Sequence, residues 1–121
     1  MSKFTIRAVK SGLKFKLRAG NGEIVAVSEV YTSRGSCLKG IESVRTCAPG
    51  AVLEDQTLPG QKEKCPKFEL YGDKRGQFRF RLKAANGKII AVSEGYTTKA
   101  ACLAGIHSVQ NNAPTAEIED Q

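Results

Sequence analysis

Apolar and basic residues alternate along two segments of the chain, residues 13–19 and 78–84. A period of two is typical of an antiparallel strand that buries one face and exposes the other. Both segments are therefore predicted to be strands whose apolar residues, such as Phe15 and Phe80, face the core. On the opposite face, these two strands are predicted to present basic side chains: Lys14, Lys16, Arg18, Arg79, Arg81 and Lys83.

An Asn-Gly pair follows each of these strands, at residues 21–22 and 86–87. Asn-Gly favours a type I′ hairpin turn, because both central residues of that turn need a positive φ. A two-residue loop would pair Leu17 with Ala26 on the core face and Lys16 with Val27 on the outer face. It would also place four aliphatic residues between the basic ones on the outer face: Val25, Val27, Ile90 and Val92.

Two later segments have the apolar spacing of a helix with one buried face. The apolar positions are Cys37, Leu38, Ile41 and Val44 in one segment and Cys102, Leu103, Ile106 and Val109 in the other. Ser33 and Thr98 are suitable N-caps, and the Ala-Pro pairs at 48–49 and 113–114 should end the helices. A glycine inside each helix, Gly40 or Gly105, suggests close contact with the sheet, since glycine costs about 1 kcal/mol there relative to alanine.

These patterns occur twice because the chain contains an internal repeat. Residues 21–56 and 86–121 carry the same residue at more than half of their positions, and both stretches end in EDQ. Repeat one spans residues 1–56, repeat two spans 67–121, and the Pro-, Gly- and Lys-containing segment 57–66 reads as a linker. Each repeat also opens with a short strand, at 3–9 or 67–72, and closes with a short strand after the helix.

The predicted fold is α+β, with each repeat arranged β-β-β-α-β. Each repeat alone is close to the lower size limit for independent folding. We therefore expect one domain, 1–121, in which two pseudo-symmetric repeats form a single antiparallel sheet with both helices on one face. The chain supplies its own second repeat, so we expect a monomer with an internal pseudo-twofold axis.

The repeated residues resemble a known family. The pattern GxFxFxLxAxNGxI, then AVSExYT, CLxGIxSV and Ala-Pro, is similar to that of the YegP-like proteins, and the similarity extends over both repeats. These are small bacterial proteins, often tandem repeats, of uncharacterised function. The resemblance implies that the C-terminal strands are exchanged between the two β(3)-α-β units. It implies no catalytic, cofactor-binding or metal-binding residues.

Net charge is +7 over 121 residues, a value within the ordinary range for a small soluble domain. A basic balance also favours polyanions such as nucleic acid. The N-terminal segment has no apolar signal core, and no apolar run approaches the roughly 18 residues that span a bilayer. We therefore expect a cytoplasmic protein with no membrane partner and reduced thiols. We favour four free cysteines, although Cys47 and Cys65 could meet across the linker.

Candidate catalytic groups are few. His107 is the sole histidine, and its five-residue separation from Cys102 is poor for a shared helix face. Glu29 and Glu94 could pair as catalytic carboxylates or metal ligands, but we expect them to balance Lys14 and Arg79 across the strands. The acids of the two EDQ ends, at 54–55 and 119–120, are expected at strand ends in solvent. No enzyme, cofactor or metal site is therefore predicted.

The basic outer face is the best candidate for a binding surface. Its six basic residues, Lys14, Lys16, Arg18, Arg79, Arg81 and Lys83, are joined by one aromatic residue, Tyr71. Such a face could bind a polyanion, or its long stems could simply shield the aliphatic residues beneath them. The leading hypothesis is a small non-enzymatic interaction module with an unknown protein partner. The alternative is a nucleic-acid-binding protein, although stacking platforms for single strands use several aromatic residues.

Overall fold

Each repeat forms three consecutive antiparallel strands, a helix and a final short strand in the computed structural model, which describes residues 1–121. Repeat one comprises β1 (Lys3–Val9), β2 (Gly12–Arg18), β3 (Ile24–Val27), α1 (Arg34–Cys47), the 3-10 turn η1 (Ala48–Gly50) and β4 (Val52–Asp55). Repeat two comprises β5 (Lys67–Gly72), β6 (Phe78–Lys83), β7 (Ile89–Val92), α2 (Lys99–Asn112), η2 (Ala113–Thr115) and β8 (Glu117–Asp120). Neither helix is long and apolar enough to cross a membrane.

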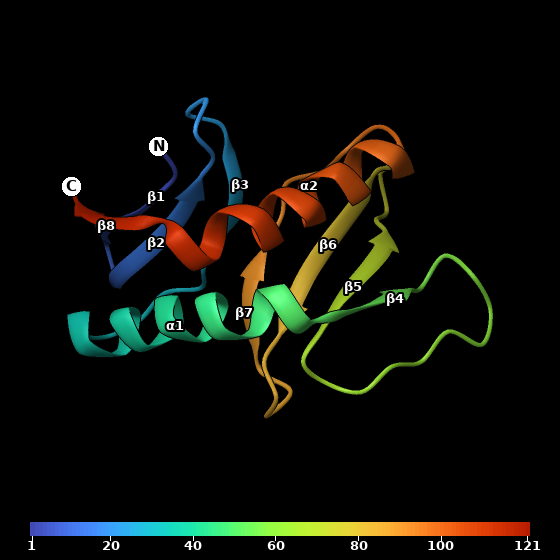
Figure 1. Ribbon diagram of the computed structural model, residues 1–121, viewed down its shortest axis with the longest axis horizontal. Helices are drawn as coiled ribbons and strands as arrows, with labels where there is room; N and C mark the ends of the chain where they lie inside the picture. The colour runs from blue at the N-terminus through green and yellow to red at the C-terminus, as the bar shows by residue number, and fades with distance from the viewer.

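The last strand of each repeat pairs with the first strand of the other repeat. The strand order is β4-β5-β6-β7-β3-β2-β1-β8, so β3 and β7 meet at the centre and the exchanged strands form the two edges. The strand exchange implied by the family resemblance is therefore confirmed. Figure 1 shows how each helix runs diagonally from its own strands toward the opposite edge of the sheet.

The single sheet is mixed, whereas the sequence predicted an antiparallel one. β4 lies parallel to β5, and β8 lies parallel to β1. The other neighbouring strands are antiparallel. The difference arises because the exchanged strand does not return beside its own hairpin. The helix carries it to the far edge, where it runs in the same direction as the first strand of the other repeat.

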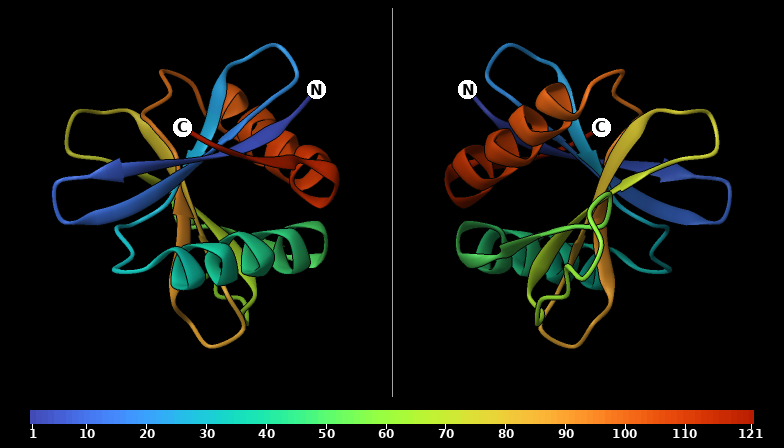
Figure 2. Two further views of the ribbon diagram at one scale, coloured as in Figure 1. Left: turned by 90° about the vertical axis from the view of Figure 1, so that its left-hand side faces the viewer. Right: turned by 90° about the vertical axis from the view of Figure 1, so that its right-hand side faces the viewer.

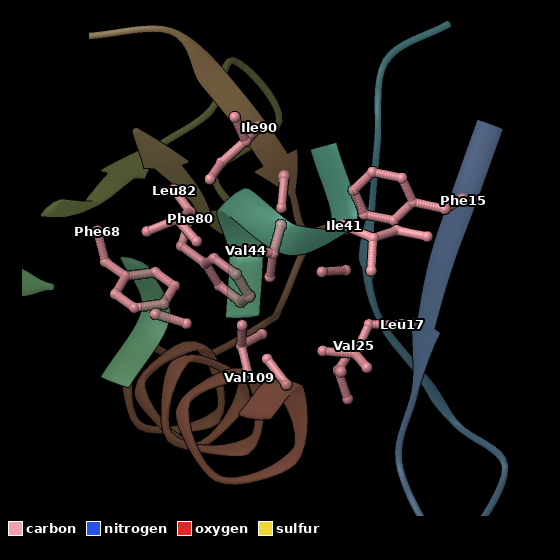
Figure 3. Close-up of a cluster of buried hydrophobic side chains, with 14 of the residues drawn as sticks. Phe15, Leu17, Val25, Ile41, Val44, Phe68, Phe80, Leu82, Ile90 and Val109 are labelled. Atoms are coloured by element: carbon pink, nitrogen blue, oxygen red, sulfur yellow. The ribbon is translucent and has the colours of Figure 1, made fainter. Parts of the chain in front are cut away.

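Both helices cover the same face of the sheet and share one core, as predicted (Figure 2). α1 packs against β2 of its own repeat and β7 of the other, and α2 packs against β6 and β3. One cluster of 23 buried apolar residues draws on both repeats. Figure 3 shows part of it, with Val44 of repeat one near Phe80 and Val109 of repeat two, and Phe15 beside Ile41. The period-two prediction of inward-facing residues is therefore confirmed.

The predicted helix signals are also confirmed. The Ser33 side chain accepts a hydrogen bond from the backbone N–H of Ser36, and α1 ends just before Pro49. Gly40 is packed so closely that a Cβ there would overlap the Tyr31 hydroxyl and lie 2.6 Å from Tyr31 Cζ. The equivalent glycine of α2, Gly105, lies under Tyr96 in the same way. The predicted close contact with the sheet is therefore confirmed, since a Cβ would also lie 3.1 Å from Phe15 or Phe80, but the tightest contact is with the tyrosine.

The hairpin turn differs from the predicted type I′. Gly22 has a φ of +87°, but Asn21 does not have a positive φ. The loop instead has three residues, closed by a hydrogen bond from Ala19 N to Glu23 O, a form that needs one left-handed glycine. The predicted Leu17–Ala26 pairing is preserved because a bulge restores the register farther along β2 and β3.

That bulge changes the outer face. Val25 and Ile90 were predicted to point outward, but each is only 7% exposed and belongs to the core. A bulge sets one extra residue against the partner strand and re-aims its side chain. Val27 and Val92 remain outside the core cluster and pair with each other where the two repeats meet.

Candidate functional site

The six predicted basic residues all lie on the face of the sheet opposite the helices, because the alternate residues of β2 and β6 are buried beneath α1 and α2. Their side chains are partly exposed. The two repeats nevertheless treat these charges differently. The half of the face formed by repeat two neutralises its cations within the protein, and the half formed by repeat one does not.

In repeat two, a buried carboxylate lies beneath the cations. Glu69 of β5 is only 2% exposed. It accepts a hydrogen bond from Arg81 Nε at 2.5 Å and pairs with Lys67 at 3.1 Å and Lys83 at 3.2 Å. Burial acts to raise the pKa of Glu69, but the bonds from Arg81, Lys67 and Lys83 outweigh it and leave the pKa below its ordinary value. The carboxylate is therefore charged and fully engaged.

A second acid extends this network to the edge strand β4. Glu54 is 4% exposed and accepts hydrogen bonds from Gln56 Nε2 at 2.6 Å, Lys67 Nζ at 2.8 Å and the backbone N–H of Glu63 at 2.7 Å. These bonds lower its pKa to about 2. The expectation that Glu54 and its neighbour Asp55 lie in solvent is wrong, because the linker folds back over Glu54 and Lys99 of α2 pairs with Asp55.

The corresponding end of repeat two fits the expectation, since Glu119 and Asp120 are exposed. Asp120 accepts hydrogen bonds from the Arg34 guanidinium, which is the counterpart of the Lys99–Asp55 pair. Glu119 pairs with Lys3 at 3.1 Å. The Glu and Asp of the same EDQ sequence are thus buried in repeat one, where the linker contacts Glu54, and exposed in repeat two.

Arg79, the third predicted basic residue of repeat two on the outer face, is also paired, but not with the predicted partner. Arg79 donates from Nε to Asp73 Oδ2 at 2.8 Å, whereas the sequence suggested Glu94 as its partner. Asp73 can reach Arg79 because it lies in the β5–β6 turn, where it also accepts hydrogen bonds from the backbone N–H groups of Arg75 and Gln77. Glu94 lies beyond the end of β7 and is exposed.

Tyr71, the single aromatic residue predicted on this face, is also occupied. The Arg81 guanidinium lies over its ring, 4.5 Å from the centroid. A cation at that distance makes a favourable interaction with the ring face. The Tyr71 ring is therefore not a free platform on which a base could stack.

Repeat one lacks all three of these partners. In the paired strands, Thr5 occupies the position of Glu69, Arg7 the position of Tyr71 and Val9 the position of Asp73. The predicted Lys14–Glu29 pair does not form, since β3 ends at Val27 and Glu29 lies beyond it. Among the basic residues of β1, β2 and the turn between them, only Lys3 forms an ion pair. The other five form none: Arg7, Lys10, Lys14, Lys16 and Arg18.

These five cations line a hollow of about 400 Å³ on the outer face. Ala8, Val9, Thr5 and Gln121 also line it, and no acidic side chain does. The side chain of Arg18 lies at one end, where its Nε is buried without a hydrogen-bond partner. We call this group, Thr5 with Arg7, Lys10, Lys14, Lys16 and Arg18, the repeat-one basic hollow.

Sequence reasoning found Lys14, Lys16 and Arg18 but missed Arg7 and Lys10. It also treated the basic residues of the two repeats as equivalent. A signal was present, because aligning the first strands of the two repeats places Thr5 against Glu69 and Arg7 against Tyr71. That comparison alone reveals that the acid and the aromatic of repeat two have no counterparts in repeat one.

The other candidate groups are not arranged for catalysis. His107 is exposed on α2, and Cys102 is fully buried. Burial raises the pKa of the Cys102 thiol to about 11, so it is a poor nucleophile near neutral pH. No cluster of three or more His, Cys, Asp or Glu side chains is placed to hold a metal ion. All four cysteines are unpaired, with Cys37 and Cys102 buried and Cys47 and Cys65 partly exposed.

Comparison with known proteins matches both repeats. Residues 10–55 and 73–120 each match the family model described as a domain of unknown function, DUF1508. A UPF0339 protein of Pseudomonas aeruginosa is 35% identical over 121 residues, which cover 99% of this chain and 97% of the relative. The UPF0339 protein YegP of Escherichia coli K12 is 39% identical over 107 residues, which cover 88% of this chain and 84% of the relative.

A shorter relative corresponds to a single repeat. The UPF0339 protein of Treponema denticola is 62% identical over 52 residues, which are 43% of this chain but 90% of that protein. The unit that repeats here therefore also occurs alone in a protein of about half this length.

Solved structures support the fold. The solution NMR structure of E. coli yegP, described as a protein of unknown function, has a TM-score of 0.82 and 35% identity, covering 99% of this chain and 92% of that one. The solution NMR structure of a UPF0339 protein from Shewanella oneidensis has a TM-score of 0.80 and 33% identity, covering 98% of this chain and 90% of that one.

Proposed function

This chain belongs to the DUF1508 family, which includes the YegP-like UPF0339 proteins and has no established function, and we propose that it is a small non-enzymatic interaction module that binds an anionic partner. The binding surface is the repeat-one half of the outer sheet face. The observation that carries the proposal is the unequal pairing of charge between two otherwise similar halves. Repeat two engages its outer cations with Glu69 and Asp73, and repeat one has neither acid.

The cations of repeat one are costly to keep unpaired. Arg7 and Lys14 lie directly opposite each other on β1 and β2, and like charges in that position destabilise a sheet. Repeat two shows how the same fold relieves this repulsion, since Tyr71 lies opposite Arg79 there. An anionic partner would relieve it in repeat one, which is why we assign binding to this half.

A non-enzymatic role is supported by the state of the candidate nucleophile and base. Cys102 is buried with a raised pKa, and His107 is exposed and separate from it. The two repeats complete one core within a single chain, which supports a monomer. Four unpaired thiols fit a reducing compartment such as the cytoplasm.

Nucleic acid is the second candidate partner, favoured by the layout of the cations. Lys14, Lys16 and Arg18 alternate along one strand, so their Cα atoms are about 7 Å apart and form a row. A row of cations can neutralise successive phosphates, and such binding weakens steeply with salt. With Tyr71 engaged by Arg81, the phosphate backbone rather than the bases would be the contact.

The proposal is tested by fluorescence anisotropy against three anionic probes: a single-stranded DNA oligonucleotide, a DNA duplex and poly-L-glutamate. The test variant is Lys14→Gln with Lys16→Gln. The matched control is Lys74→Gln with Lys88→Gln, two exposed lysines outside the hollow, which lowers the net charge equally. Circular dichroism confirms that each variant remains folded.

We expect at least one probe to bind with a dissociation constant that rises with salt. The test variant should weaken that binding about tenfold or more, since hydrogen bonds to charged groups contribute roughly 1.5–3 kcal/mol each. The control should bind nearly as the natural protein does. Absence of binding to all three probes at low salt, or equal loss in the test and control variants, would overturn the proposal.

A further inference from the structure

We infer that the repeat-one basic hollow is a site for phosphoryl groups, and that its ligand carries more than one of them. This inference rests on the proposed function and names the chemistry that the site recognises. The argument comes from what occupies the equivalent space in repeat two, and from the donors and dimensions of the hollow.

The first step is that repeat two holds an anion where repeat one has space. The Glu69 carboxylate lies beneath Arg81, Lys67 and Lys83 and interacts with all three. In repeat one, the matching strand positions bring Lys16 and Arg18 together around Thr5, which is shorter and uncharged. Repeat two thus contains a built-in example of the anion that the repeat-one cations lack.

The second step concerns the donors that remain unused. Arg18 Nε is buried and has no hydrogen-bond partner, and its NH1 group makes only a 3.4 Å contact with the carbonyl of Gly22. In contrast, Arg81 on the other half donates from Nε to a carboxylate at 2.5 Å. A buried donor left unpaired is unfavourable, so an acceptor that reached the Arg18 guanidinium would stabilise the protein.

The third step identifies the ligand as phosphate rather than base or sugar. The charged side chains of the hollow are all donors, namely arginine and lysine. Neither residue can accept a hydrogen bond, and the lining contains no aromatic ring on which a base could stack. Phosphoryl oxygens accept several charge-assisted hydrogen bonds at once, and arginine binds them through two parallel bonds. Thr5 and Gln121, which also line the hollow, can both donate and accept hydrogen bonds. With five cations and no acid, the lining therefore suits a ligand that presents mainly acceptor oxygens and negative charge.

The fourth step is size. Neighbouring strands are about 5 Å apart and alternate residues along one strand about 7 Å apart. Five cations from Arg7 and Lys10 at one end to Arg18 at the other line one hollow of about 400 Å³. A single phosphate is too small to reach cations at both ends. A condensed phosphate, or consecutive phosphates of a nucleic acid strand, could engage them together.

Sodium tripolyphosphate is the probe, because it presents linked phosphoryl groups without base or sugar. Titration is followed by two-dimensional ¹H–¹⁵N NMR, with sodium sulfate and sodium chloride at matched ionic strength as controls. A 5′-phosphorylated oligothymidine and poly-L-glutamate are measured in parallel. The variants are Arg7→Gln with Lys14→Gln and, separately, Thr5→Glu, with Lys74→Gln plus Lys88→Gln as the charge-matched control.

We expect tripolyphosphate to shift the amide signals of β1 and β2 and to leave those of β5 and β6 nearly unchanged. The Arg7/Lys14 variant should weaken binding about tenfold or more. Thr5→Glu should abolish binding by supplying the carboxylate that repeat two already has. Binding to oligothymidine that tripolyphosphate displaces would identify a nucleic acid backbone as the source of the phosphates, and binding of tripolyphosphate alone would identify a free condensed phosphate.

The inference is overturned if tripolyphosphate binds no better than sulfate at equal ionic strength, or if its binding is unchanged in the Arg7/Lys14 variant. In that case, binding of poly-L-glutamate that depends on Lys14 and Lys16 would leave the proposed function standing with a carboxylate-bearing partner. Failure of every anion to bind would remove both proposals.

Discussion

Replacing Glu69 by threonine would give repeat two the residue that repeat one already carries at that position. The substitution removes a carboxylate that is 2% exposed and that interacts with Arg81 at 2.5 Å, Lys67 at 3.1 Å and Lys83 at 3.2 Å. The backbone should tolerate the change, because Thr5 occupies the same position in a strand of the same geometry. The result would measure what the buried acid contributes to folding.

The expected loss can be worked out from the burial of the partners. Removing one member of a buried ion pair typically destabilises a protein by about 3–5 kcal/mol, because the remaining charges are left uncompensated. Here the cations are not fully buried, since the side chains of Lys67, Lys83 and Arg81 are 13%, 26% and 29% exposed. They can turn partly toward water, so we expect a loss at or just below the lower end of that range, about 2–3 kcal/mol. For a chain of this length that corresponds to a fall in Tm of about 10 °C.

Far-UV circular dichroism is a suitable assay, because the chain contains no tryptophan. The matched control is Glu94→Thr, which removes an exposed acid with the same change in charge. The gap between the natural protein and Glu69→Thr should also depend on pH. Because the folded pKa of Glu69 lies below its ordinary value of 4.5, its contribution is fully present above that pH and is lost as the pH falls through the folded pKa.

The reasoning is refuted if Glu69→Thr unfolds within about 2 °C of the Glu94→Thr control at neutral pH, since a difference that small corresponds to roughly half a kcal/mol. A gap between the natural protein and Glu69→Thr that widens on acidification would contradict the assigned direction of the pKa shift. Either result would also weaken the use of Glu69 as a guide to the missing anion in repeat one.

Two further predictions test the packing and the linker. Gly40→Ala should destabilise the protein by about 1–3 kcal/mol in thermal unfolding, because the new Cβ would overlap Tyr31. The control Gly35→Ala should be neutral or slightly stabilising, because no other side chain would lie closer than 4.0 Å to its Cβ. Glu54→Gln should lower the free energy of unfolding at pH 7 and make it depend less steeply on pH between about pH 4.5 and 2. The reason is that the Glu54 pKa is lowered to about 2 in the folded protein, so the stability contributed by its carboxylate is lost as the pH falls through that range. If the variant's stability fell as steeply with pH as that of the natural protein, the Glu54 carboxylate would not be held by Lys67 and the linker.

Local patterns predicted most of the fold because each depends on neighbours in the chain. The alternation around Phe15 placed the strand faces, Ser33 placed the start of α1, and the Ala-Pro pair placed its end. The bulge at Val25 could not be predicted, because an Asn-Gly pair suits both a two-residue loop and the three-residue loop that forms. The register beyond the bulge is the same in the two cases, so the error was confined to the direction of Val25 and Ile90.

Features that depend on contacts between distant segments could not be predicted from the local sequence patterns. Glu54 and Glu119 occupy equivalent positions in the two repeats, yet the first is buried and the second is solvated. The difference comes from the linker, whose Glu63 N–H donates to Glu54, and nothing in the EDQ motif reveals that contact. The parallel pairing of β4 with β5 likewise depends on the position at which β4 joins the sheet after α1.

The contrast between the two halves of the outer face gives a reason for keeping two copies in one chain. The shared core needs Phe15 and Phe80, and both helices need a glycine beneath a tyrosine, so these residues are alike in the two repeats. The core places no such demand on the outer face, and there the repeats differ in kind. Repeat two uses Glu69 to hold its cations in place, which adds stability. The opposing Arg7 and Lys14 in repeat one cost on the order of 0.2–1 kcal/mol, a small part of the roughly 5–15 kcal/mol of a typical domain. A shared core thus allows one repeat to pair its outer cations while the other leaves them without ion-pair partners, as the proposed anion site requires.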